Sequence, residues 1–139
     1  MRTRSSIVAV GLTAALVGLT GGVAAAQVPQ HRVTLTGAEE TAKADRNGSG
    51  QFSWSLDGTQ LCYLLSAKKI GTAVAAHIHR GKAGVDGAVV ATLTAPTPAS
   101  AGCATVSATL ATNLRNHPAR FYVNVHTAAF PAGAIRSQL

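Results

Sequence analysis

The sequence predicts an all-β fold, an antiparallel Greek-key sandwich or barrel. Apolar and polar residues alternate over several short segments, which is typical of strands that bury one face. Turn-forming residues separate these segments at spacings of about ten residues, as in small sandwiches and barrels. No strand is followed by a long helical segment, so a parallel α/β fold is disfavoured.

About eight short strands and one short helix follow from this pattern. The clearest strand covers residues 51–57, with Phe52, Trp54 and Leu56 on one face. The following Asp57-Gly58 pair predicts a hairpin turn into residues 60–66. The helix is expected at residues 110–116, before Pro118. The other strands are expected at residues 33–36, 74–79, 88–94, 103–109, 121–127 and 135–139.

Residues 1–26 are typical of a secretory signal peptide. Arg2 and Arg4 form a basic start, an uncharged apolar stretch covers residues 7–19, and residues 24–26 are a small-residue cleavage signal. The alternative, a membrane anchor, needs roughly 18 or more consecutive apolar residues. We therefore expect cleavage after Ala26 and a secreted or extracytoplasmic domain over residues 27–139, with no transmembrane anchor in the mature chain.

Cys62 and Cys103 are the only cysteines in the chain. A single pair in an exported protein usually forms a disulfide, and two separate buried thiols are the alternative. The bridge would close a loop of about 40 residues and stabilise the fold by roughly 4 kcal/mol on the chain-entropy model.

The chain is basic, with twelve Lys and Arg against five Asp and Glu and a formal net charge of +7. The basic residues occur singly or in pairs, without aromatic residues between them. This pattern is typical of a solvated surface that keeps a protein soluble, so we expect no nucleic-acid partner.

Three of the five histidines fall on polar faces of two predicted strands. His77 and His79 are two residues apart in the strand 74–79, so both side chains point to one face. His126 shares the polar face of the strand 121–127 with Tyr122 and Asn124. The opposite faces are apolar and are expected in the core, namely Val74, Ala76 and Ile78 in the first strand and Phe121, Val123 and Val125 in the second.

A His-x-His pair on a strand can chelate a metal ion, because both imidazoles project the same way. Neutral imidazole suits copper and zinc, and a third histidine would complete a three-histidine site with an open position. This requires the strands of His77, His79 and His126 to be neighbours. The alternative is that these histidines only form hydrogen bonds with backbone carbonyls or neighbouring polar side chains. The cofactor is therefore left unknown, with copper or zinc as candidates.

No catalytic motif stands out. The sequence has no nucleophile elbow, no zinc-protease motif and no Walker-type phosphate loop. The glycine-rich segment 81–87 joins two strands, so its glycines are expected to supply turn conformations. Arg136 and Gln138 point away from Ile135 in the last strand and could share the histidine face, where we expect a surface hydrogen-bond ladder.

Three separated motifs resemble the CHRD domain, a family named after chordin. The central motif covers residues 76–90, and the closing motif covers residues 121–127 and continues to residue 139. The opening motif covers residues 35–40 and has Glu40 at the family's acidic position. The resemblance implies an extracellular β-rich module, and it offers no catalytic residues to transfer. Ala134 stands where the family often has Glu, which weakens any role for a carboxylate beside His126 and Arg136.

The histidine pattern is also similar, in spacing only, to the copper site of Cu/Zn superoxide dismutase. That chemistry normally needs a fourth ligand and a histidine that bridges to zinc, and the sequence identifies neither. Similar folds carry unrelated functions, so the likeness alone does not imply an activity.

Two functions remain open. We expect a secreted CHRD-domain protein without evident catalytic machinery, a binding or envelope-associated module for an unknown extracellular ligand or protein. The alternative is a copper- or zinc-binding redox protein with a superoxide-dismutase-like site. Because no catalytic motif stands out, the sequence leans against an enzyme. The candidate metal ligands are His77, His79 and His126. The candidate polar patch contains Tyr122, Asn124, Arg136, Gln138 and Glu40.

Overall fold

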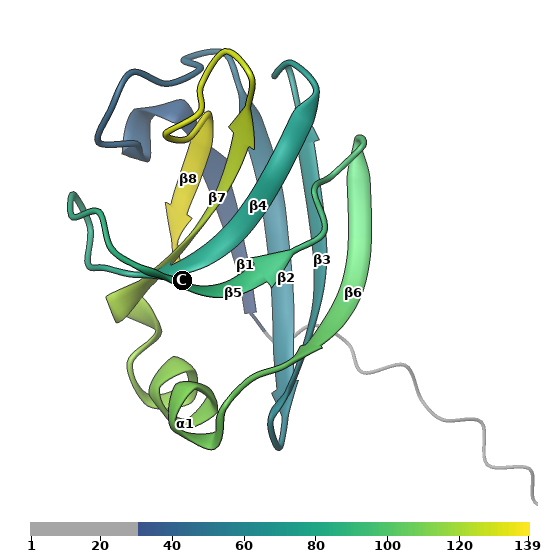
Figure 1. Cartoon of the computed structure of the whole chain (residues 1–139), viewed down its shortest axis with the longest axis vertical. Coiled ribbons are helices and arrows are strands. Elements are labelled where there is room, and N and C mark those ends of the chain that lie inside the picture. Colours follow the sequence, from purple (N-terminus) through teal and green to yellow (C-terminus); the bar gives the residue numbers. More distant parts are fainter. Residues whose placement is uncertain (1–30) are drawn as a thin grey trace, which may run out of the picture.

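A computed structural model describes residues 31–139, which form a single antiparallel sheet and one α-helix (Figure 1). The predicted signal peptide and its cleavage site lie outside the described residues. The strands are β1 (His31–Thr36), β2 (Ser49–Asp57), β3 (Gln60–Lys68), β4 (Ala73–Arg80), β5 (Val89–Leu93), β6 (Ala99–Thr105), β7 (Phe121–Thr127) and β8 (Ile135–Gln138). The helix α1 covers Ala108–Asn116, and short 3-10 turns cover Gly37–Glu39 and Pro118–Arg120.

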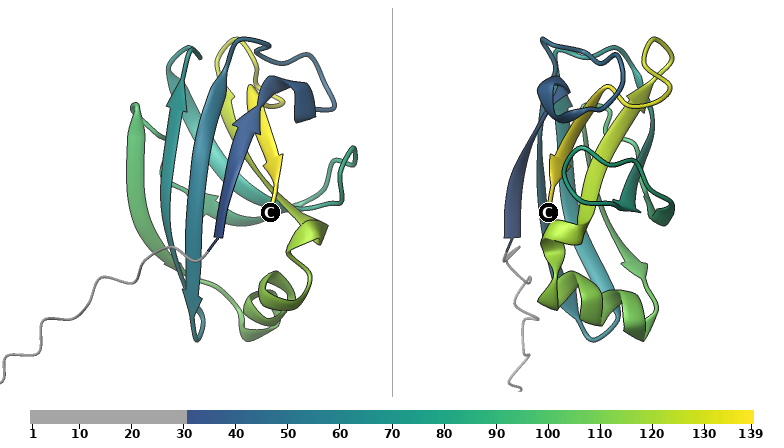
Figure 2. Two further views of the ribbon diagram at one scale, coloured as in Figure 1. Left: turned by 180° about the vertical axis from the view of Figure 1, so that it is seen from behind. Right: turned by 90° about the vertical axis from the view of Figure 1, so that its left-hand side faces the viewer.

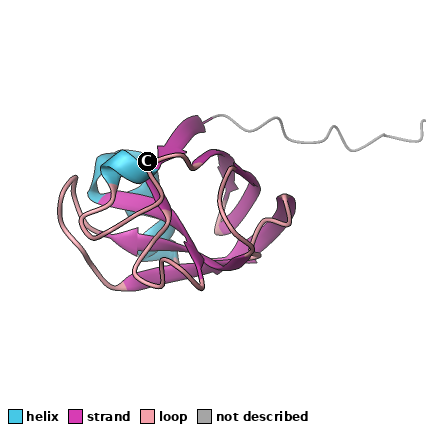
Figure 3. Ribbon diagram, turned by 90° about the horizontal axis from the view of Figure 1, so that it is seen from above, coloured by secondary structure: helices cyan, strands magenta, loops and turns pink. Residues whose placement is uncertain are grey.

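The eight strands follow the order β5-β4-β7-β8-β1-β2-β3-β6. Every pair is antiparallel. The two end strands, β5 and β6, approach each other, so the sheet is rolled into a nearly closed barrel (Figure 3). β7 returns to lie beside β4, while β5 and β6, which lie between them in the chain, are the two end strands of the sheet. The predicted all-β fold is confirmed.

The inner faces of the strands form one apolar core. The predicted inward faces of β2 and β7 lie in the core, since Phe52, Trp54 and the three apolar residues of β7 are fully buried and Leu56 is partly buried against them. The helix α1 lies at one end of the sheet, where it adds Leu110, Ala111 and Leu114 to the core (Figure 2). Within residues 31–139 no helix is long and apolar enough to cross a bilayer.

The strand predicted at residues 103–109 is displaced. In the structure, β6 begins at Ala99 and ends at Thr105. The Ser107 hydroxyl accepts a hydrogen bond from the backbone N–H of Leu110, so Ser107 caps α1, and residues 108 and 109 belong to the helix. A serine cap satisfies an N–H that the first helical turn leaves unpaired, and here it decides the boundary.

Val74 was expected in the core and is instead 61% exposed. The pairing of β4 with β7 is irregular between Ala73 and Ala75, which shifts the alternation by one residue at the start of β4. Such a bulge turns neighbouring side chains to the opposite face. Ala73 therefore takes the buried position that the sequence pattern assigned to Val74.

The predicted disulfide is present between Cys62 in β3 and Cys103 in β6. The two residues lie directly opposite each other in the β3–β6 ladder. The bridge therefore links the end strand β6 to its only paired neighbour in the sheet.

Candidate metal-binding site

The outer faces of β4 and β7 bring the three predicted histidines together. The two strands pair antiparallel, with His77 opposite Asn124, His79 opposite Tyr122 and Ala75 opposite His126. Side chains on one face of neighbouring strands lie close together. The structure therefore provides the strand pairing that a three-histidine site requires, and we call His77, His79 and His126 the histidine cluster.

The nitrogens of the histidine cluster converge. His77 Nδ1 lies 3.1 Å from His126 Nε2. One nitrogen from each ring can be chosen so that all three lie within 4.8 Å of one another. Among residues 31–139 this is the only group of three or more His, Cys, Asp and Glu side chains with such a spacing.

Backbone carbonyls hold two of the three rings by their Nδ1 atoms. His79 Nδ1 donates to the carbonyl of Gly87 at 2.8 Å, and His126 Nδ1 donates to the carbonyl of Pro131 at 3.0 Å. A neutral imidazole that donates through Nδ1 keeps a lone pair on Nε2, which is how metal-binding histidines are commonly oriented. His79 is only 9% exposed, and its Nε2 is buried without a hydrogen-bond partner in the described chain.

The cluster favours neutral imidazoles. Burial lowers the pKa of His77 below its usual value, and the nearby His126 and His79 lower this pKa further. Burial also lowers the pKa of His126, since it outweighs the opposing effect of the hydrogen bond to Pro131. Neutral imidazole is the form that binds metal ions, so the surroundings keep these two rings competent to bind at neutral pH.

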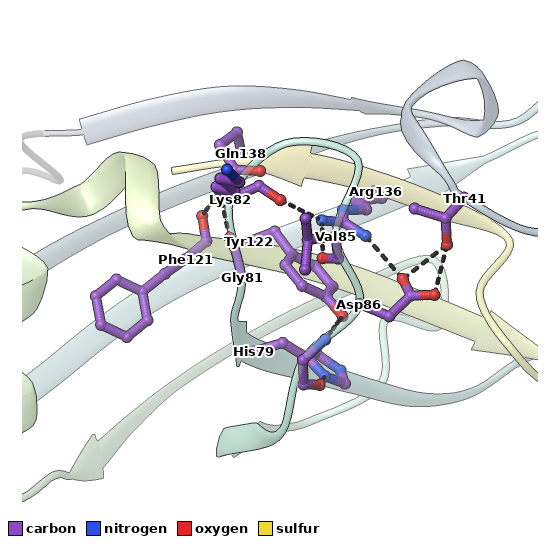
Figure 4. A network of polar contacts seen from close by, with 11 residues as sticks. Thr41, His79, Gly81, Lys82, Val85, Asp86, Phe121, Tyr122, Arg136 and Gln138 are labelled. Atoms are coloured by element: carbon purple, nitrogen blue, oxygen red, sulfur yellow. Dashed lines mark hydrogen bonds and ion pairs between the residues drawn. The ribbon is translucent and has the colours of Figure 1, made fainter.

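The patch residues Tyr122 and Arg136 form a stack with His79. The His79 and Tyr122 rings are nearly parallel, with centroids 4.7 Å apart. The Arg136 guanidinium carbon lies 3.3 Å from the centroid of the Tyr122 ring. Because β7 lies between β4 and β8, Tyr122 lies between the imidazole and the guanidinium (Figure 4).

The expected surface ladder at Arg136 is wrong, because this side chain is only 1% exposed. The loop 81–87 covers it (Figure 4). Nη1 of Arg136 donates to Asp86 Oδ1 at 3.1 Å, and Nη2 donates to the carbonyls of Val85 at 2.9 Å and Lys82 at 3.3 Å. A guanidinium has several donors in a rigid fork, which suits it to hold such a loop.

Gln138 and Asn124 complete the polar face. The Gln138 side-chain amide donates to the carbonyl of Gly81, at the start of the loop, at 2.7 Å. Asn124 is 2% exposed, and its Oδ1 is buried without a hydrogen-bond partner in residues 31–139. Asn124 lies in register between His77 on β4 and Arg136 on β8. Asn124 therefore lies between the histidine cluster and Arg136 in the sheet.

Glu40 lies beside the Arg136 region rather than in the histidine cluster. Burial raises the pKa of Glu40 to about 7, although Arg136 acts to lower this pKa, and Asp86 raises it. Glu40, Arg136 and Gln138 share a surface cavity of about 510 Å³ with the tip of the loop at Ala83 and Gly84. The structure thus places Glu40 next to Arg136, but shows no contact between Glu40 and a histidine.

The sequence did not identify the groups that orient the rings. Gly87 and Pro131 act through their backbone carbonyls, and a backbone carbonyl is present at every position of the chain. The one available signal was the short distance along the chain between His79 and the glycine-rich segment 81–87. Asp86 was also missed, although it accepts from both Arg136 and the Thr41 hydroxyl.

Comparison with known proteins agrees with this fold and these motifs. The CHRD domain model matches residues 31–139, the whole of the described chain. No curated protein and no solved structure matches the sequence. Since the match covers more than half of its residues, the chain belongs to the CHRD domain family.

Proposed function

We propose that this protein is exported and acts outside the cytoplasm as a binding module that holds one copper or zinc ion. The CHRD domain, the Cys62–Cys103 disulfide and the leader-like residues 1–26 support the extracytoplasmic part of the proposal. His77, His79 and His126 would be the metal ligands. The role is one of binding, since the described chain has no evident catalytic constellation.

The arrangement of donor hydrogens in the histidine cluster carries this proposal. Two imidazoles have their Nδ1–H groups bonded to carbonyls, which leaves lone pairs on the Nε2 atoms of His79 and His126. The His126 Nε2 then accepts from His77 Nδ1–H at 3.1 Å, and a metal ion would replace this shared proton, with the His77 ring protonated on Nε2 instead. Zinc binds imidazole nitrogen at about 2.0–2.1 Å, so a small rotation of the half-buried His77 and His126 rings would gather the three nitrogens around one ion.

Three protein ligands leave a position for another donor. In zinc proteins that position holds water or a bound molecule. Here that position would accept a donor atom from an extracellular ligand or protein, so the module would bind its partner through the metal ion. The dismutase-like alternative needs ligands for a second metal ion, and no observation in residues 31–139 favours it.

Metal titration of the untagged apoprotein tests the proposal. Calorimetric titration with Zn²⁺, and with Cu²⁺ in a weakly chelating buffer, should show one equivalent bound. The triple variant His77→Ala, His79→Ala, His126→Ala should lose this binding. His117→Ala, which replaces an exposed histidine outside the cluster, is the matched control and should keep it. Absence of binding to the wild type, or undiminished binding to a folded triple variant, would overturn the proposal.

Export is tested separately by mass spectrometry of the protein recovered outside the cytoplasm. The proposal predicts a mature N-terminus at Gln27, after the small-residue signal at residues 24–26. An intact N-terminus with all of the protein retained in the cytoplasm would contradict export and leave the metal proposal to its own test.

A further inference from the structure

The single described hydrogen bond of the His79 side chain ends on a loop that has no secondary structure of its own. The acceptor is the Gly87 carbonyl, and residues 81–88 are irregular between β4 and β5. The orientation of His79, and thus which nitrogen keeps its proton, depends on where the loop holds this carbonyl. The contacts that hold the loop in place therefore also hold the His79 imidazole in its orientation.

Arg136 is the main side chain that fixes the loop. It reaches Lys82, Val85 and Asp86 with three hydrogen bonds from β8, some fifty residues further along the chain. Its only carboxylate partner, Asp86, is 71% exposed, whereas Arg136 itself is buried. A buried guanidinium is costly unless its hydrogen bonds are satisfied, so the loop and Arg136 depend on each other.

Tyr122 connects the two ends of this arrangement. Its hydroxyl accepts from the Gly87 backbone N–H at 3.3 Å, while the Gly87 carbonyl accepts from His79. Its ring lies against both His79 and the Arg136 guanidinium. Gly87 is held from both sides, and the residue must be glycine, because a Cβ there would lie 1.6 Å from the Arg80 carbonyl oxygen.

We infer that Arg136 is a positioning residue of the metal site. It clamps the loop 81–87 so that the Gly87 carbonyl holds the Nδ1–H of His79, and this leaves the lone pair on Nε2. The inference rests on the proposed function for its metal-binding consequence. The effect on the His79 tautomer is independent of any metal.

Charge and geometry make opposite predictions here. If Arg136 acted only through its positive charge, its removal would strengthen the binding of a cation. If it acts as a clamp, replacement by glutamine, which removes the charge, should weaken binding. Replacement by lysine should also weaken binding, because lysine keeps the charge but lacks the planar fork of the guanidinium. Loss of a group that orients a metal ligand commonly weakens metal affinity by about 10–100-fold.

The variants Arg136→Gln and Arg136→Lys test the inference, with Arg46→Gln at an exposed loop position as the matched control. Long-range ¹H–¹⁵N NMR on the apoproteins reports which ring nitrogen of His79 carries the proton. We expect the Nδ1–H form in the wild type and the control, and a mixture of forms in both Arg136 variants. Zn²⁺ affinity, measured by competition with a chelator, should fall by about 10–100-fold in both variants and stay unchanged in the control.

An unchanged His79 tautomer with unchanged affinity in both variants would overturn the inference. So would tighter Zn²⁺ binding in Arg136→Gln alone, since that result would indicate charge repulsion. Should the Arg136 variants fail to fold by circular dichroism, Asp86→Ala tests the same clamp from the exposed side and should change the tautomer in the same direction. If the wild type binds no metal, the proposed function fails, and the tautomer measurement still decides about the clamp.

Discussion

Two buried acceptor atoms without hydrogen-bond partners lie on the face that β4 and β7 share, and a third, Glu40 Oε1, lies beside Arg136. His79 Nε2 and Asn124 Oδ1 are both shielded from solvent, and neither meets a donor in the described chain. Buried polar atoms are almost always paired, so each such exception needs an explanation. Both atoms offer lone pairs, and a bound cation or a water attached to it would satisfy them. This residue-scale chemistry agrees with the proposed metal site.

Glu40 illustrates how one residue responds to its neighbours. The Gly133 backbone has φ 146°, and a Cβ at this position would lie 2.2 Å from Glu40 Oε1, so the turn packs closely over the carboxyl group. Burial raises the pKa of Glu40 from 4.5 to about 7 despite the nearby Arg136. Removal from water thus outweighs the attraction between the two side chains.

We predict that Glu40→Gln stabilises the fold at alkaline pH. The pKa is higher in the folded state, so Glu40 contributes stability at acidic pH that is lost as pH rises from 4.5 through about 7. Above pH 7 the neutral amide should therefore raise the free energy of unfolding by about 1 kcal/mol, after allowance for the partial exposure of the group. Urea unfolding at pH 5 and pH 8 measures the difference. A variant that is less stable at pH 8 would show that attraction to Arg136 dominates.

At the scale of elements, the loop 81–87 uses its glycines in two ways. Gly84 has φ 73°, the turn role expected from the sequence. Gly81 instead allows close approach, because a Cβ there would lie 2.6 Å from the Val85 carbonyl oxygen and 3.0 Å from the Tyr122 ring. Close approach to other parts of the fold is a tertiary requirement, and the local sequence pattern does not distinguish it from a turn.

The helix α1 supplies apolar side chains to one end of the barrel. Leu114 follows Leu110 by four residues and Ala111 by three, so the three share one helical face and pack into the core. The short apolar face is enough to hold a nine-residue helix that would not be stable alone.

We predict that Leu114→Ala lowers the free energy of unfolding by about 2–5 kcal/mol, because it removes a fully buried side chain and leaves a cavity. Chemical unfolding followed by tryptophan fluorescence measures the change. Thr112→Ala, at an exposed position of the same helix, is the control and should change stability by less than about 0.5 kcal/mol. Equal effects of the two substitutions would contradict the role assigned to α1.

At the scale of the whole molecule, the barrel depends on long-range pairing. The C-terminal strand β8 joins β7 to β1, so the two ends of the described chain meet in the middle of the sheet. The disulfide crosslinks β3 to β6 beside the place where the sheet closes. Covalent linkage restricts the unfolded chain and so favours the closed sheet.

We predict that the double variant Cys62→Ser, Cys103→Ser is less stable than the oxidised protein by roughly 4 kcal/mol on the chain-entropy model, for a loop with a sequence separation of 41. Urea unfolding with and without reductant measures the loss. Reductant should destabilise the wild type and leave the double variant unchanged. An oxidised wild type no more stable than the double variant would refute the stabilising role of the bridge.

Local patterns predicted most of the fold. The alternation in β2 and β7, the hairpin after Asp57 and the short helix before Pro118 depend on neighbouring residues, and all appear in the structure. The two errors, in the end of β6 and in the burial of Val74, have causes that the alternation of residues does not show. Ser107 moved a boundary by capping α1, and a bulge at the start of β4 exposed Val74.

The sequence by itself determined the faces, the cysteine pair and the family, because alternation with a period of two and motif order can be read along the chain. Only the tertiary structure decided that β4 and β7 are neighbours in a register that gathers His77, His79 and His126. It also decided that Arg136 is buried beneath the loop 81–87 and that the carbonyls of Gly87 and Pro131 orient two imidazoles. These contacts join distant segments and use backbone atoms common to every residue, so they arise from the packing of the whole chain.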